Sequence, residues 1–189
     1  MIQSLAVFCG SKEGNNVVFS EQANQLGKLL ATHGIRLIYG GGNAGMMGVV
    51  ANACLENGGT VIGVIPEMLE KIERSHKDIT ELLVVEDMHT RKKKMYELSD
   101  AAIILPGGYG TLDELFEMIT WNNLYIHSKQ IFILNSDGYY DYLLQHVQKM
   151  HEEGFLYESP ETFITVLNKP EQLEAHIGSQ QSPGLKTYS

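Results

Sequence analysis

The chain has 189 residues, with 14 lysine and arginine residues against 23 aspartate and glutamate residues, and a formal net charge of −9. Its length suits a single domain, and its acidic balance argues against non-specific binding to DNA or RNA. No apolar run approaches the roughly 20 residues of a membrane span, and the N-terminus lacks the basic region of a signal peptide. The two cysteines, Cys9 and Cys54, have no metal-binding spacing. We therefore expect a protein of the reducing cytoplasm, with no disulfide framework and no structural zinc site.

Short apolar runs alternate with amphipathic segments along the whole chain. Strands are expected over residues 5–9, 35–39, 60–65, 82–85, 101–105, 130–134 and 162–167. Helices are expected over residues 15–33, 46–57, 89–98, 111–123, 139–152 and 171–176, and residues 67–80 are polar and irregular. Apolar strands that alternate with helices are typical of a parallel sheet covered on both faces. We predict one doubly wound α/β domain over residues 1–177, with a disordered tail over residues 178–189.

In a sheet of this kind, ligands bind outside the carboxyl ends of the strands. Four segments follow expected strands at that edge: residues 10–11, 40–42, 88–91 and 106–111. The last two open helices, which places Arg91 and Glu114 each in a first helical turn at the same edge. The topology thus predicts that residues far apart in sequence gather at one site.

The glycines are concentrated at this edge. Eight of the 19 lie in two stretches, residues 40–48 and 107–110. A loop without Cβ atoms lets backbone N–H groups approach an anion, and the helix that follows adds its unsatisfied N–H groups and the positive end of its dipole. One such loop is best explained as a tight turn, but two at one edge favour a phosphorylated ligand.

Glu114 and Arg91 each admit two explanations. The spacing from Thr111 to Glu114 fits a capping box, in which Thr111 caps the helix and Glu114 reaches back to it. Alternatively, Glu114 is a carboxylate beside the phosphate loop that stabilises positive charge on a sugar or activates a water. A cation is unfavourable at a helix N-terminus, so Arg91 indicates an anion nearby, either a ligand or Glu114.

A dinucleotide-binding motif is a competing interpretation. Gly40, Gly42 and Gly45 match G-x-G-x-x-G, and Glu67 lies about 20 residues further on, as in the NAD fingerprint. The motif follows the second expected strand instead of the first, and it leaves residues 106–111 unexplained. An NAD(P)-dependent oxidoreductase therefore stays an alternative.

Several motifs agree, in order and spacing, with those of a known family. Residues 106–114, PGGYGTLDE, match the signature PGGxGTxxE, and residues 88–92, MHTRK, match the element MHxRK. The chain resembles, over about residues 4–167, the LOG ("lonely guy") family of cytokinin riboside 5'-monophosphate phosphoribohydrolases. Members of this family are often labelled lysine decarboxylases, but this sequence has no pyridoxal-phosphate signal.

The resemblance implies a Rossmann-like fold and hydrolysis of the N-glycosidic bond of a cytokinin riboside 5'-monophosphate or AMP. The products are a free adenine-type base and ribose 5-phosphate, and no metal or other cofactor is implied. The ligand is a small nucleoside monophosphate, the protein is expected to be a cytoplasmic homodimer, and neither nucleic acid nor a membrane is an expected partner.

The catalytic pair of the family falls on Arg91 and Glu114. The glycine-loop argument and the resemblance together give these substrate contacts: Gly41, Gly42, Glu73, Met88, Lys92, Gly107, Gly108, Tyr109, Gly110, Thr111 and Thr120. We expect Glu114 to stabilise an oxocarbenium-like state or to orient the attacking water. Arg91 would assist departure of the base or hold the ribose and Glu114 in place.

Two positions depart from the family pattern. Lys12 stands where the family often has a second serine, and Gln130 stands where proline is common. These differences bear on substrate preference, and the choice between AMP and a cytokinin nucleotide stays open. A non-catalytic nucleotide-binding or carrier protein on the same fold is the other alternative.

Overall fold

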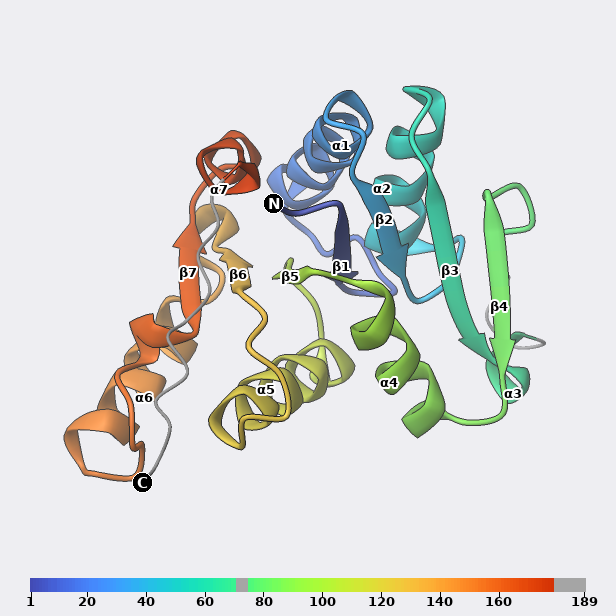
Figure 1. Ribbon diagram of the computed structural model, residues 1–189. Helices are drawn as coiled ribbons and strands as arrows, with labels where there is room; N and C mark the ends of the chain where they lie inside the picture. Colours follow the sequence, from blue (N-terminus) through green and yellow to red (C-terminus); the bar gives the residue numbers. More distant parts are fainter. Residues whose placement is uncertain (71–74, 179–189) are drawn as a thin grey trace.

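The computed structural model describes residues 1–70 and 75–178 and confirms the expected parallel sheet (Figure 1). Its strands are β1 (Ser4–Phe8), β2 (Arg36–Tyr39), β3 (Val61–Pro66), β4 (Glu81–Val85), β5 (Ala101–Ile104), β6 (Ile131–Leu134) and β7 (Ile164–Leu167). They form one seven-stranded sheet in the order β4-β3-β2-β1-β5-β6-β7, and every neighbouring pair is parallel. The predicted tail lies outside the described residues, apart from Gly178, and so does Glu73.

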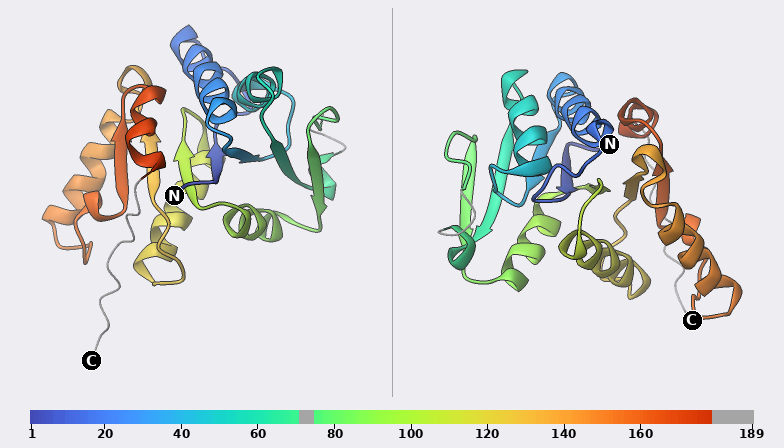
Figure 2. Two further views of the ribbon diagram at one scale, coloured as in Figure 1. Left: turned by 45° about the horizontal axis from the view of Figure 1, so that its top comes forward. Right: turned by 180° about the vertical axis from the view of Figure 1, so that it is seen from behind.

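Helices cover both faces of the sheet (Figure 2). They are α1 (Val17–Thr32), α2 (Gly45–Glu56), α3 (Glu67–Glu70), α4 (Met88–Leu98), α5 (Tyr109–Asn123), α6 (Asp141–Glu152) and α7 (Glu174–Ile177). The described residues also form three short 3₁₀ helices, which are η1 (Ser136–Gly138), η2 (Pro160–Thr162) and η3 (Pro170–Leu173). The sequence did not predict α3 or η2, because one turn of helix leaves too few residues to show a periodic pattern.

The core consists of two clusters, one on each side of the sheet. Leu5 and Val7 of β1 pack on the side of α1 and α2, and Ala6 and Phe8 pack on the side of α4 and α5. Successive residues of a strand point to opposite faces, so a strand covered on both faces needs apolar residues at every position. This is why β1 shows no alternation of polar and apolar side chains.

The strand order reverses between β1 and β5, which are neighbours in the sheet although 92 residues separate Phe8 from Ala101 in the chain. The loops that follow these two strands touch, since the Gly10 N–H donates to the Pro106 carbonyl oxygen at 3.1 Å. A Cβ atom on Gly107 would lie 2.8 Å from the Gly10 nitrogen. Such a reversal point is where α/β sheets place their ligands.

Helices α1 and α2 approach each other closely through Gly27. A Cβ atom at this position would lie 2.5 Å from the Val50 carbonyl oxygen and 2.8 Å from the Ala53 Cβ. The absence of a side chain thus sets the distance between these two helices. In the part of the chain that the structure describes, no helix is long and apolar enough to cross a membrane.

We predict that Gly27→Ala lowers the free energy of unfolding by about 1–3 kcal/mol, because the added methyl forces the two helices apart. Lys28→Ala, at the exposed neighbouring position, is the control and should change it by less than about 0.5 kcal/mol. Urea unfolding followed by circular dichroism measures both. Equal stability of the two variants would contradict the packing argument.

Candidate active site

Helix α4 begins at the carboxyl edge and directs Arg91 into the protein. The Asp87 carboxylate caps the helix by accepting from the Thr90 N–H at 2.7 Å. One residue later, the Arg91 side chain is only 7% exposed, and its Nε donates to the Val64 carbonyl oxygen at 3.0 Å. Its Nη2 donates to the Gly40 carbonyl oxygen at 3.1 Å. Two backbone carbonyls therefore fix the guanidinium at the ends of β2 and β3.

The glycines after β2 are explained by packing and backbone conformation. A Cβ atom on Gly40 would fall on the Arg91 Nη2. Gly41 and Gly45 have φ angles of +76° and +59°, a region that side chains disfavour. A Cβ on Gly45 would also lie within 2.5 Å of Ser11 backbone atoms. Gly42 is paired with Ser75 in an antiparallel bridge. Contacts of Gly41 and Gly42 with substrate stay a prediction.

The loop after β5 leads directly into helix α5. Helix α5 begins at Tyr109 with Gly108 at its N-cap, and no side chain of the described residues caps it. The expected capping box is therefore wrong: Thr111 lies inside the first turn, buried against Gly107. The helix starts two residues earlier than the sequence suggested, because glycine leaves the start of a helix undefined in the sequence pattern. Glu114 is thereby free of a capping role.

Two glycines at this helix start have no packing role in the described structure. A Cβ atom on Gly108 or Gly110 would meet no described atom within 4 Å, and neither residue has a positive φ. Tyr109 between them is 94% exposed. The first N–H groups of α5 thus lie open at the positive end of the helix dipole, which is an arrangement suited to binding an anion.

Glu114 lies on the inner side of α5 and is 8% exposed. Burial raises its pKa to about 7, and the neighbouring charges of Asp113 and Glu117 act in the same direction. The positive charges of Arg91 and Lys92 oppose this rise in the pKa. The carboxyl group is therefore poised to exchange a proton near neutral pH, as general acids and bases do.

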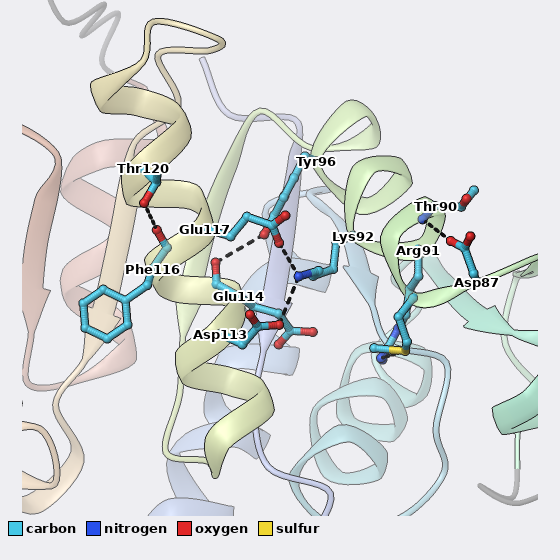
Figure 3. A network of polar contacts seen from close by, with 11 residues as sticks. Asp87, Thr90, Arg91, Lys92, Tyr96, Asp113, Glu114, Phe116, Glu117 and Thr120 are labelled. Carbon is cyan, nitrogen blue, oxygen red and sulfur yellow. Dashed lines mark hydrogen bonds and ion pairs between the residues drawn. The ribbon is translucent and has the colours of Figure 1, made fainter.

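Lys92 contacts acidic side chains of α5 (Figure 3). Its Nζ lies 2.5 Å from a Glu117 carboxylate oxygen and 3.0 Å from an Asp113 carboxylate oxygen. Met88, at the start of α4, places its sulfur 3.8 Å from the Arg91 Nη1. The structure thus brings the predicted residues Met88, Arg91, Lys92 and Glu114 together from two helices.

Thr120 does not lie with this group. Its hydroxyl donates to the Phe116 carbonyl oxygen at 2.7 Å, and the side chain lies on a part of α5 that faces away from Lys92 and Arg91 (Figure 3). Thr120 is exposed in the chain as described. Its contact with substrate stays a prediction, as does that of Glu73, which lies outside the described residues.

Sequence reasoning missed two neighbours of the site. Cys9 is partly buried and packs against the core cluster on the side of α1 and α2. Burial of its thiol raises the pKa, Glu114 raises it further, and Arg91 opposes the rise. The Tyr139 hydroxyl donates to the Gly107 carbonyl oxygen at 2.7 Å. The position of Cys9 directly after β1, at the carboxyl edge, was the available signal for its place in the site.

A pocket of about 250 Å³ adjoins the glycine loop after β5. Its lining includes Gly10, Ser11, Lys12, Gly107, Gly108 and Tyr139. Lys12 thus departs from the family pattern at a position that faces the ligand-binding edge. The start of α5 lies at this pocket, and the buried Arg91 guanidinium and the Glu114 carboxyl, with its pKa of about 7, lie on α4 and α5. An α/β protein with these groups at one edge of its sheet is suited to binding an anion and to exchanging a proton.

Comparisons with known proteins identify the family. The family described as "Possible lysine decarboxylase" matches residues 47–177. The probable cytokinin riboside 5'-monophosphate phosphoribohydrolase LOGL1 of Oryza sativa subsp. japonica is 51% identical over 152 residues, which cover 80% of this chain and 68% of that protein. The cytokinin riboside 5'-monophosphate phosphoribohydrolase of Rhodococcoides fascians is 42% identical over 96% of this chain and 90% of that protein. The chain belongs to the LOG family.

Solved structures share the fold at lower identity. The molybdenum cofactor carrier protein of Chlamydomonas reinhardtii superposes with a TM-score of 0.72 at 20% identity, covering 94% of this chain and 96% of that one. The molybdenum cofactor binding protein of Rippkaea orientalis gives a TM-score of 0.68 at 23% identity, with the same coverage. At this identity the similarity supports the Rossmann-like fold alone.

We predict that Glu114→Gln stabilises the fold at pH 8 and not at pH 5. The pKa of Glu114 is raised from 4.5 to about 7 in the folded protein. The protonated carboxyl therefore makes its full contribution to the free energy of unfolding below about pH 4.5, and this contribution is lost as the pH rises through 7. A neutral glutamine escapes this loss, which reaches up to about 3 kcal/mol.

Urea unfolding of both proteins at pH 5 and pH 8 provides the measurement. Glu97→Gln, on the exposed side of α4, removes the same charge and should show no comparable dependence on pH. A Glu114→Gln variant that is no more stable than the wild-type protein at pH 8 would show that Glu114 is not destabilised by burial.

Proposed function

We propose that this chain hydrolyses the N-glycosidic bond of a nucleoside 5'-monophosphate, and that it releases an adenine-type base and ribose 5-phosphate. The observation that carries the proposal is the buried Glu114 carboxyl, with a pKa of about 7, in the same helix as an open N-terminus that suits a phosphate. The names of relatives at 42% and 51% identity support the same reaction.

The 5'-phosphate binds at the start of α5. Backbone N–H groups at Gly108, Tyr109 and Gly110 provide donors that no described side chain covers, and the helix dipole favours the negative charge. The buried Thr111 hydroxyl lies beside this loop. Anchoring the phosphate fixes the ribose relative to Glu114, which lies one turn further along the helix.

The reaction breaks the bond between the ribose C1' and the base nitrogen and forms a bond from C1' to a water oxygen. Positive charge develops on the ribose ring as the base departs. The Glu114 carboxylate stabilises this charge and accepts a proton from the attacking water. The proton that Glu114 accepts is passed on, directly or through water, to the departing base nitrogen, so that Glu114 returns to its carboxylate form and one water molecule is consumed in each turnover.

Arg91 holds the geometry of this step. Its guanidinium is fixed by the Gly40 and Val64 carbonyl oxygens, and its positive charge acts on Glu114. A planar fork with several donors can bind carbonyls and still present an N–H group to a ribose oxygen or to the departing base. Arg91 thereby keeps part of the Glu114 population ionised at neutral pH.

The proposed substrates are cytokinin riboside 5'-monophosphates and AMP, and the proposed setting is a homodimer in the cytoplasm. Both cysteines are free, as a reducing compartment would keep them. Exposed apolar side chains near the C-terminal half of α5 favour self-association: Phe116, Leu124 and Ile126 are 37%, 63% and 62% exposed. Apolar groups of this kind mark contact surfaces when they lie together.

The structure weakens the oxidoreductase alternative. A side chain at position 40 would overlap Arg91, and a side chain at position 45 would be strained by the positive φ and would overlap the Ser11 backbone. Packing and backbone conformation thus explain Gly40 and Gly45 of the apparent dinucleotide motif without a ligand. A carrier protein would bind AMP without releasing base and would have no use for a carboxyl group with a raised pKa.

We predict that the wild-type protein releases free base from AMP and from N6-isopentenyl-AMP. Glu114→Gln and Arg91→Gln should each lower kcat/KM by at least about 100-fold, since each removes a charge that acts on the transition state. Lys93→Gln, at the 63%-exposed neighbouring lysine, is the control and should keep full activity. Full activity in either Glu114→Gln or Arg91→Gln would reject the catalytic pair, and binding of AMP without base release would favour a carrier.

We predict that Gly110→Ala separates stability from phosphate binding. Alanine inside a helix is favoured over glycine by up to about 1 kcal/mol, so the thermal midpoint should not fall. The added methyl enters the space that we assign to the phosphate, and KM for AMP should rise by about tenfold or more. Inhibition by adenosine, which lacks the phosphate, is the control and should not weaken. An unchanged KM for AMP would place the phosphate elsewhere.

A further inference from the structure

Polar contacts join helices α4 and α5 behind the catalytic pair. Lys92 of α4 lies between the Glu117 carboxylate at 2.5 Å and the Asp113 carboxylate at 3.0 Å. Four residues further along α4, the Tyr96 hydroxyl donates to the Glu114 carbonyl oxygen at 3.2 Å. Figure 3 shows these contacts bridging the two helices.

The pair of Lys92 and Glu117 differs from the surface pairs of the protein. Their side chains are 15% and 18% exposed, whereas Lys93 and Glu97 are 63% and 53% exposed at a distance of 4.0 Å within one helix. Exposed pairs within a helix contribute little. A short, mostly buried pair between two helices fixes their relative position, because separating it leaves a poorly solvated charge.

This pair connects the two turns that carry the catalytic residues. Lys92 directly follows Arg91 on α4, and Glu117 lies one turn beyond Glu114 on α5. A shift of one helix against the other would change the separation of the guanidinium and the carboxyl. The Lys92–Glu117 contact is therefore placed to hold that separation constant.

We propose that Glu117 is a positioning residue, which acts through Lys92 to fix Glu114 opposite Arg91. Its carboxylate also balances the positive charge of Lys92 beside Glu114. The inference rests on the proposed function of Arg91 and Glu114. It assigns to Lys92 a contact with α5 in place of a direct contact with substrate.

The charges that face Glu114 predict how its pKa changes when Glu117 is replaced. From α4, Arg91 and Lys92 lower its pKa; from α5, Asp113 and Glu117 raise it. The neutral groups that face it are the Cys9 thiol after β1 and the Tyr96 hydroxyl of α4. Replacing Glu117 by glutamine leaves the positive charge of Lys92 less balanced, so the pKa of Glu114 should fall.

The test compares Glu117→Gln with the control Glu97→Gln, which removes one negative charge from an exposed position of α4. In Glu117→Gln, kcat for AMP should fall by about tenfold or more while KM changes by less than about twofold, because misplacement acts on the reaction step. The limb of the pH–rate profile that Glu114 controls should move to lower pH. Glu97→Gln should match the wild-type protein in all three quantities.

Lys92 supplies a second pair of variants. Lys92→Arg keeps a cation between the two helices and should retain most of the activity, whereas Lys92→Gln should lose activity to the same degree as Glu117→Gln. A rise in KM with unchanged kcat, in either Glu117→Gln or Lys92→Gln, would show that the pair binds substrate directly. A wild-type pH profile with wild-type kcat in Glu117→Gln would show that its role is structural only; each of these results overturns the proposal.

A measurement on the free protein separates this inference from the proposed function. The pKa of Glu114, followed by NMR of carboxyl-labelled glutamate, should be lower in Glu117→Gln than in the wild-type protein, whether or not base is released from AMP. Absence of base release by the wild-type protein would reject the proposed function, and an unshifted pKa of Glu114 would reject the role of Glu117.

Discussion

The burial of two opposite charges is the constraint on which this structure depends. Arg91 and Glu114 are both more than nine-tenths buried, and a charge in that position requires compensation from nearby dipoles or charges. Two backbone carbonyls hold Arg91, and they can do so only because Gly40 has no side chain. Glu114 has positive charge from α4 beside it and keeps a pKa near neutrality. The packing of the carboxyl edge thus keeps the Glu114 carboxyl buried with a raised pKa, and this lowers the stability of the fold where that carboxyl is ionised.

The fold itself does not determine the reaction. Proteins that carry or bind the molybdenum cofactor share this sheet at 20% and 23% identity, and unrelated functions commonly occupy one α/β architecture. What is distinctive here is the combination at the reversal of strand order: an uncapped helix start, a guanidinium held by backbone, and a carboxyl that is shielded from water. The first of these suits an anion. We assign to the guanidinium and the carboxyl the stabilisation of the charge that develops beside it.

Much of this arrangement could be predicted from the sequence, and the part that could not has a physical explanation. Apolar strands that alternate with helices predicted the parallel sheet, and the carboxyl-edge rule brought Arg91 and Glu114 together. The start of α5 was placed two residues too late, because Gly107 and Gly108 fit a turn and a helix cap equally well. The contact of Lys92 with Glu117 was not predicted, since it depends on the distance between two helices that are adjacent only in the folded chain. Burial, which sets the pKa of Glu114, likewise appears only with the fold.

We assign to this site the cleavage of an N-glycosidic bond with water. Incubation with AMP in water enriched in ¹⁸O, followed by mass spectrometry of the products, tests it most directly. We expect free adenine without label and ribose 5-phosphate with one labelled oxygen, because water forms the new bond to C1'. Formation of adenosine and labelled orthophosphate would instead show attack at phosphorus, and would contradict the roles that we assign to Glu114 and to the start of α5.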